Sequence, residues 1–252
     1  MHKLVEYSDS DDESADEKQR VDFTPEELIV VDGQESKKDQ ASEAGELDSH
    51  QGRIRSFPHE RGNWASYVCI PVPYSDDFEE LSASLTEILR ASCTQHSFHA
   101  IPSPHISLTR TLKLRHHWLA DLTQGLLQMC SLYKQFYISL RDVQVYTNDE
   151  KSRTFISVKV VSGDDHLTSI VHKLNSLLTE YNLPPFYQEA SFHVSLCSCV
   201  HDARVALTPV MSKLQNAVDE WIRDNPECAF FSVNKLLWKA GNKETWLSLD
   251  VS

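Results

Sequence analysis

One four-residue motif, His-x-Ser-Leu, occurs twice in the sequence, at residues 105–108 and 193–196. Both copies lie among aliphatic and β-branched residues, which favours β-strand. Side chains two positions apart on a strand point to the same face, so each copy presents an imidazole and a hydroxyl together. A single copy is most simply a histidine with a satisfied hydrogen bond, but a random chain would contain two such tetrads only on the order of one time in a hundred.

The residue types in this motif suit the cleavage of a phosphodiester. Two histidines can act as base and acid in one displacement near neutral pH. Serine hydroxyls can donate hydrogen bonds to the non-bridging oxygens, where negative charge accumulates. If the two strands lie side by side, four donors converge on one phosphate without a metal ion. We therefore interpret four residues as catalytic: His105, His193, Ser107 and Ser195.

Other chemistries have no comparable signal. With only seven glycines, the chain contains neither a G-x-G-x-x-G loop nor a Walker A motif. No G-x-S-x-G elbow supports a serine nucleophile. The six cysteines include no pair of C-x-x-C units of the kind that binds zinc, and we interpret them as reduced thiols of a cytosolic or nuclear protein. We expect no metal and no cofactor.

Strands and amphipathic helices alternate around the motifs and must position them. Apolar runs and period-2 patterns predict strands at 64–72, 106–112, 136–147, 153–161, 192–199, 230–239 and 244–251. Patterns of period 3.6 predict helices at 76–93, 117–133, 164–181 and 208–221. Because several strands follow one another through short turns, we expect antiparallel ladders and an α+β fold.

Charge divides the chain into two regions. Residues 1–50 contain 16 acidic and 5 basic residues, which leaves 21 acidic and 19 basic residues in the remainder. The nearly neutral remainder is compatible with an RNA substrate. Residues 1–55 have too little apolar surface to offset the entropy of ordering, so we predict a disordered acidic leader there and a folded domain at 60–252. No stretch is apolar and long enough to span a membrane.

The paired His-x-Ser units resemble the 2H phosphoesterase superfamily. Within that superfamily, the sequence resembles the nuclear phosphodiesterases that process the 3′ end of U6 spliceosomal small nuclear RNA. Three further segments carry this narrower resemblance: residues 61–65, 186–193 and 239–243. The resemblance covers the chain from about residue 62 to its end.

The resemblance implies a bilobal fold in which two pseudo-symmetric antiparallel sheets with flanking helices form a central cleft. It also implies a metal-independent 3′-5′ exoribonuclease that trims the oligouridine tail of U6 RNA and leaves a 2′,3′-cyclic phosphate, which some members open to a 3′-phosphate. Tyr187 is then the aromatic residue that binds substrate by stacking on the terminal base. On the same ground His193 is the base and His105 the acid. We expect a nuclear monomer that binds RNA, and neither DNA nor a membrane.

Three alternatives stay open at this point. A different 2H chemistry, hydrolysis of 2′,3′-cyclic or 2′,5′-linked nucleotides, would use the same motifs. A non-catalytic member would bind a nucleotide in the same cleft, although the four intact motif residues argue against this. An adaptor would act through its acidic leader, with the folded part as a scaffold.

The sequence departs from the family pattern after the second motif. Family members tend to have Gly-Asp there, whereas this chain has His201-Asp202. A residue with a side chain resists the left-handed backbone conformation that glycine adopts freely. The departure from the family pattern therefore concerns the local turn after the second motif.

Overall fold

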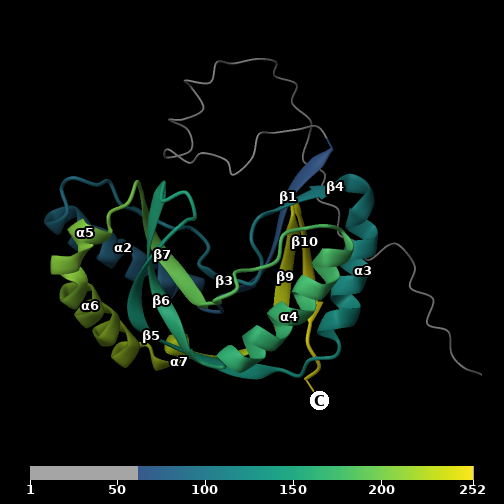
Figure 1. The fold of residues 1–252 in the computed structure, drawn as a ribbon. Helices are drawn as coiled ribbons and strands as arrows, with labels where there is room; N and C mark the ends of the chain where they lie inside the picture. Colours follow the sequence, from purple (N-terminus) through teal and green to yellow (C-terminus); the bar gives the residue numbers. More distant parts are fainter. Residues whose placement is uncertain (1–61, 252) are drawn as a thin grey trace, which may run out of the picture. The chain divides into compact units, whose positions relative to one another are not determined.

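The computed structural model describes residues 62–251, in which helices pack against an antiparallel sheet (Figure 1). The predicted acidic leader, residues 1–55, lies outside the described residues. Within residues 62–251, no helix combines the length and the apolar character needed to cross a membrane.

All the strands of this part of the chain belong to one ten-stranded sheet. Their bounds are β1 (Asn63–Pro71), β2 (His99–Ala100), β3 (His105–Ser107), β4 (Leu112–Arg115), β5 (Phe136–Thr147), β6 (Arg153–Ser162), β7 (His193–Val200), β8 (Phe230–Val233), β9 (Lys235–Ala240) and β10 (Lys243–Ser248). Eight strands follow the order β10-β9-β1-β3-β7-β6-β5-β8, while β2 pairs with β7 and β4 with β1. The mixture of helices with this sheet confirms the α+β class.

The middle of the sheet joins its two halves. β3 pairs with β7 at one position, where Ile106 lies opposite Val194. β1, β9 and β10 continue the sheet on one side of this join, and β6, β5 and β8 on the other (Figure 1). The two sheets that the resemblance implies are thus two halves of one curled sheet.

Helices cover each half of the sheet separately (Figure 1). Their bounds are α2 (Ser75–Ser92), α3 (Leu119–Cys130), α4 (Asp164–Glu180), α5 (Arg204–Leu207), α6 (Met211–Asp224) and α7 (Pro226–Ala229), with single 3₁₀ turns η2 (His116–Trp118) and η3 (Thr208–Val210). α2 packs against β7, α6 packs against β5, and these two helices contact each other. α3 packs against β10 and α4. Burying the apolar faces of these helices fixes the strands from behind.

Two predicted strands are each divided in the structure. The strand predicted at 106–112 is two strands, β3 and β4, which both pair with β1. Between them the Thr109 hydroxyl accepts a hydrogen bond from the Val68 backbone N–H at 3.0 Å, where a ladder bond would otherwise stand. The strand predicted at 230–239 divides at Asn234, because β8 pairs with β5 in one half while β9 pairs with β1 in the other.

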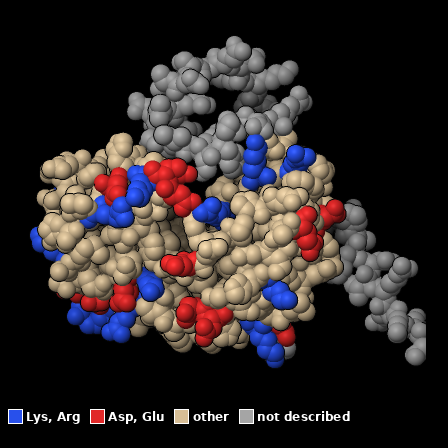
Figure 2. Space-filling view, viewed as in Figure 1, with Lys and Arg blue, Asp and Glu red and all other residues tan. Residues whose placement is uncertain are grey.

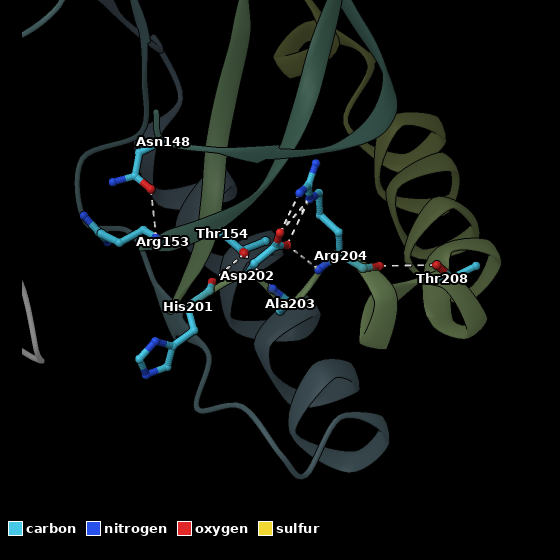
Figure 3. A network of polar contacts seen from close by, with 8 residues as sticks. All are labelled: Asn148, Arg153, Thr154, His201, Asp202, Ala203, Arg204 and Thr208. Atoms are coloured by element: carbon cyan, nitrogen blue, oxygen red, sulfur yellow. Dashed lines mark hydrogen bonds and ion pairs between the residues drawn. The ribbon is translucent and has the colours of Figure 1, made fainter. Parts of the chain in front are cut away.

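The turn after β7, where the sequence departs from the family pattern, contains a residue in the left-handed conformation. His201 has φ of 67°, in the region that glycine favours. Its backbone N–H donates to the Ser152 carbonyl at 2.6 Å. Its carbonyl accepts from the Thr154 hydroxyl at 2.7 Å, as Figure 3 shows. The Thr154 hydroxyl in turn accepts from the Ala203 N–H at 2.9 Å. These bonds hold the turn although residue 201 is not glycine.

We expect His201→Gly to stabilise the protein by about 0.5–1 kcal/mol, because the steric cost of the left-handed conformation that it removes exceeds the opposing cost of the greater unfolded-state entropy of glycine. Urea unfolding of the purified variant measures this change. His201→Ala is the matched control, because it removes the imidazole but keeps the Cβ atom. An equal gain in the alanine variant would show that the backbone conformation is not the cause.

Candidate active site

The two motif strands lie side by side at the centre of the sheet. β3 and β7 run antiparallel, with Ile106 opposite Val194. One residue to either side, this register sets each motif histidine opposite the serine of the other motif: His105 opposite Ser195, and Ser107 opposite His193. All four side chains therefore share one face of the sheet. In the space-filling view, which has the orientation of Figure 1, the surface is hollowed near its centre (Figure 2). Both basic and acidic side chains lie at the edge of this hollow.

Aliphatic side chains anchor both motif strands from the opposite face. The predicted anchors are all fully buried: Ile106, Leu108, Val194 and Leu196. A β-bulge follows the second motif, because Ser157 pairs with Ser195 while Ile156 pairs with Cys197. The extra residue is Leu196, so Ser195 stays on the open face while Leu196 and Cys197 both enter the core.

Each motif histidine is oriented by the carbonyl two residues before it. Nδ1 of His105 lies 3.0 Å from the Ser103 carbonyl oxygen, and Nδ1 of His193 lies 2.7 Å from that of Ser191. A carbonyl oxygen can only accept, so Nδ1 carries the proton in both rings. In the neutral imidazole, Nε2 is then the unprotonated nitrogen. The same nitrogen, Nε2, is thus able to accept a proton in both histidines.

The two histidines differ in how deeply they are packed. The His193 ring stacks on Tyr146 from β5, with centroids 3.8 Å apart and planes 13° apart. The centroid of the His105 ring lies farther, 5.8 Å, from the centroid of the Tyr67 ring. Burial lowers the pKa of the His193 imidazole below its ordinary value; its hydrogen bond to Ser191 opposes this shift, and the charge of His105 adds to it. Burial therefore favours the neutral form of the His193 imidazole.

The two motif serines also have different neighbours. The Ser195 hydroxyl lies 3.0 Å from the hydroxyl of Ser157, a fully buried residue of β6. At the equivalent place in the other half, Cys69 of β1 pairs with Ser107. Burial raises the pKa of the Cys69 thiol to about 12, so it stays protonated. Ser195 is thus oriented by a hydroxyl, whereas Ser107 lies beside a thiol.

Tyr187, the predicted base-stacking residue, is 44% exposed. The Arg110 guanidinium lies over its ring, 4.1 Å from the centroid. Arg110 also bonds to Asp149, in the turn between β5 and β6, at 2.5 Å. The stacking of Tyr187 on a terminal base stays a prediction. Among the buried side-chain nitrogens and oxygens of the described residues, Nε of Arg110 is the one without a hydrogen-bond partner.

Sequence patterns did not single out three residues of this region. Tyr146 and Ser157 come from strands β5 and β6 and reach the site only through the pairing of β6 with β7. Nothing in their local sequence shows that pairing. Arg110 gave a usable signal, since it is a cation three residues after Ser107.

Among residues 62–251, no group of three or more His, Cys, Asp or Glu side chains is arranged so that it could hold a metal ion. All six cysteines are unpaired and buried, which agrees with the interpretation of reduced thiols.

Two His-x-Ser motifs on adjacent central strands of an antiparallel sheet define a 2H phosphoesterase. A family model described as HVSL, an uncharacterised conserved protein, matches residues 30–248, and its four letters are those of residues 193–196. The match begins within the leader, about thirty residues before the resemblance noted from the sequence.

Curated relatives give a narrower assignment. U6 snRNA phosphodiesterase 1 of Mus musculus is 37% identical over 221 residues, covering 86% of this chain and 82% of the relative. The Xenopus laevis protein of the same name is 38% identical over 199 residues, covering 79% and 78%. A solved structure, Kluyveromyces marxianus Usb1, is 17% identical at a TM-score of 0.49 and covers 76% of this chain and all of its own. By its sequence relatives, the chain belongs to the U6 snRNA phosphodiesterase 1 family.

Proposed function

We propose that this protein trims the oligouridine 3′ tail of U6 small nuclear RNA as a metal-independent 3′-5′ exoribonuclease, acting as a monomer in the nucleus. The register of β3 against β7 is the observation that carries the proposal, because it gathers two imidazoles and two hydroxyls on one face. The relatives that share the chain's family are named for U6 snRNA, which supplies the substrate.

The reaction is a transesterification within the RNA. The 2′-hydroxyl of the penultimate ribose attacks the adjacent phosphorus, and one histidine Nε2 removes its proton. The other histidine Nε2–H protonates the departing 5′-oxygen of the terminal nucleotide. Ser107 and Ser195 donate to the non-bridging oxygens as negative charge develops on them. The RNA is left with a 2′,3′-cyclic phosphate.

The packing of His193 gives a physical reason to assign the two proton transfers. A general base must enter the reaction unprotonated, and burial lowers the pKa of His193. His193 is therefore the base, and the more open His105 is the acid. The resemblance to the family led to the same assignment.

We expect the rising limb of the pH profile of kcat/KM to lie below about 6.5, the ordinary histidine pKa, because protonation of His193 removes the base. Tyr146→Ala uncovers the His193 ring, so its pKa should rise toward the ordinary value and move this limb to higher pH. Tyr137→Ala, an exposed tyrosine on the same strand, is the control and should leave the limb in place. An unmoved limb in Tyr146→Ala would contradict the assignment of the base.

Mass spectrometry of the 3′ ends formed from an oligouridine substrate tests the proposed function, with EDTA present throughout. We expect successive loss of single nucleotides, a 2′,3′-cyclic phosphate end, and an undiminished rate. Activity that EDTA abolishes and magnesium or zinc restores would contradict the metal-independent mechanism. Cleavage only of supplied 2′,3′-cyclic or 2′,5′-linked nucleotides would replace RNA trimming with that related chemistry.

A further inference from the structure

A separate cavity of about 530 Å³ opens at the start of β1. Its walls carry two cations, two aromatic rings and two amides: Lys113, Arg115, Trp118, Tyr181, Asn63 and Asn182. None of these residues belongs to the motifs or to the groups that orient them.

Three parts of the chain build this cavity. β4 pairs with β1 so that Arg115 lies opposite Asn63 and Lys113 lies opposite Ala65. Trp118 comes from the turn η2, and Tyr181 follows the end of α4.

The rings and the cations of this cavity contact one another. The Trp118 and Tyr181 rings meet edge to face at 5.8 Å, and the Arg115 guanidinium lies 5.2 Å from the centre of the Trp118 ring. Aromatic faces beside cations are the usual means of holding single-stranded nucleic acid, because bases stack on the rings while phosphates pair with the charges.

Strand β1 connects the cavity to the motif histidines. Side chains alternate along a strand, so Asn63, Ala65 and Tyr67 share one face. Tyr67 lies beside the His105 ring, at 5.8 Å. From Tyr67 to Asn63 is about 13 Å of extended strand. The cavity is therefore within reach of an RNA strand that is bound at the motifs.

Two further segments run between the motifs and the cavity. Arg110, Lys113 and Arg115 are spaced along the chain from the end of β3 through β4. The segment from α4 to β7 borders the cavity at Leu183 and then carries Tyr187, which contacts Arg110. Figure 1 shows this segment crossing from the end of α4 to β7. Cationic and aromatic side chains thus continue from the motifs toward the cavity.

We propose that this cavity binds the RNA strand on the 5′ side of the scissile phosphate, with a base against Trp118 or Tyr181 and phosphates on Lys113 and Arg115. The assignment of the cavity to the 5′ side of the cleaved bond rests on the proposed function. A 3′ exonuclease that removes one nucleotide at a time has only that nucleotide on the 3′ side of the cleaved bond. A site some distance from the motifs can then be reached only by the 5′ part of the strand.

Binding of 2′-O-methyl oligouridylates tests this inference, because the blocked 2′-hydroxyl prevents cleavage. Arg115→Gln, at an exposed position, should weaken binding of the decamer several-fold and lower the slope of log K against log salt by about 0.7, the value of one lost phosphate contact. Trp118→Leu should weaken it by about tenfold through lost stacking. Binding of the dimer should not change in either variant. Lys173→Gln, an exposed lysine of α4, is the control and should change neither affinity.

Unchanged decamer binding in both variants would overturn the inference, as would an equal loss with the dimer, which is too short to reach the cavity. Cleavage of ordinary diuridylate by the wild-type protein is measured alongside. If the wild-type protein cleaves diuridylate but neither variant changes the affinity for the decamer, the inference fails and the proposed function stands. If the variants weaken decamer binding but no RNA is cleaved, the RNA site stands and the proposed function fails.

Discussion

Replacing either motif histidine with alanine is expected to lower kcat by at least about 10²-fold, the usual contribution of one positioned acid or base. The two losses have different origins. His193→Ala removes the imidazole that Tyr146 covers, which is the proposed base. His105→Ala removes the proposed acid, so that the 5′-oxygen would have to leave as an unprotonated alkoxide. Steady-state trimming of an oligouridine substrate measures both.

Two controls separate lost chemistry from lost folding. His172→Ala changes an exposed histidine of α4 and should leave kcat at the wild-type value. Thermal unfolding of both motif variants checks that each still folds cooperatively. A folded His105→Ala or His193→Ala protein that trims at the wild-type rate would exclude that histidine from the reaction.

Alanine in place of either motif serine is expected to lower kcat on the order of 10²-fold, as for the loss of one oxyanion donor. The hydroxyls act on charge that is larger in the transition state than in bound substrate, so kcat and kcat/KM should fall together. Ser107→Ala and Ser195→Ala are compared with Ser107→Thr and Ser195→Thr, which keep a hydroxyl and should retain more activity. A rise in KM with unchanged kcat would show that the serines only bind substrate.

Ser157 offers an internal comparison for this prediction. Its hydroxyl lies 3.0 Å from that of Ser195 on the same face of the sheet, but Ser157 itself is fully buried. Ser157→Ala should therefore lower kcat less than Ser195→Ala, through poorer positioning of the Ser195 hydroxyl. The effect of Ser157→Ala should also disappear in a protein that already carries Ser195→Ala, because a positioning residue acts only through the group it positions.

The motif strands could be predicted because the pattern that defines each of them lies within a few consecutive residues. The period of two in each copy assigns polar residues to one face and aliphatic residues to the other, and the structure buries Ile106 and Val194 as this pattern requires. The helices behind them followed from their apolar stripes in the same way.

The rest of the site depends on pairings between distant segments. That Tyr146 covers His193 follows from β5 and β6 being added beside β7, which no local pattern encodes. The division of residues 106–112 into two strands depends on the Thr109 hydroxyl meeting Val68 across the sheet. For the same reason the near-identical motifs gave no chemical basis for choosing the base, whereas the unequal burial of their histidines does.

A diuridylate with sulfur in place of the 5′-bridging oxygen tests the central claim most directly, because a thiolate leaves without needing a proton. We expect His105→Ala to cleave this substrate at close to the wild-type rate, and His193→Ala to remain at least about 10²-fold slower, since the 2′-hydroxyl still requires a base. Restored cleavage by His193→Ala in place of His105→Ala would reverse the two roles. Restored cleavage by neither variant would contradict acid–base catalysis by this histidine pair.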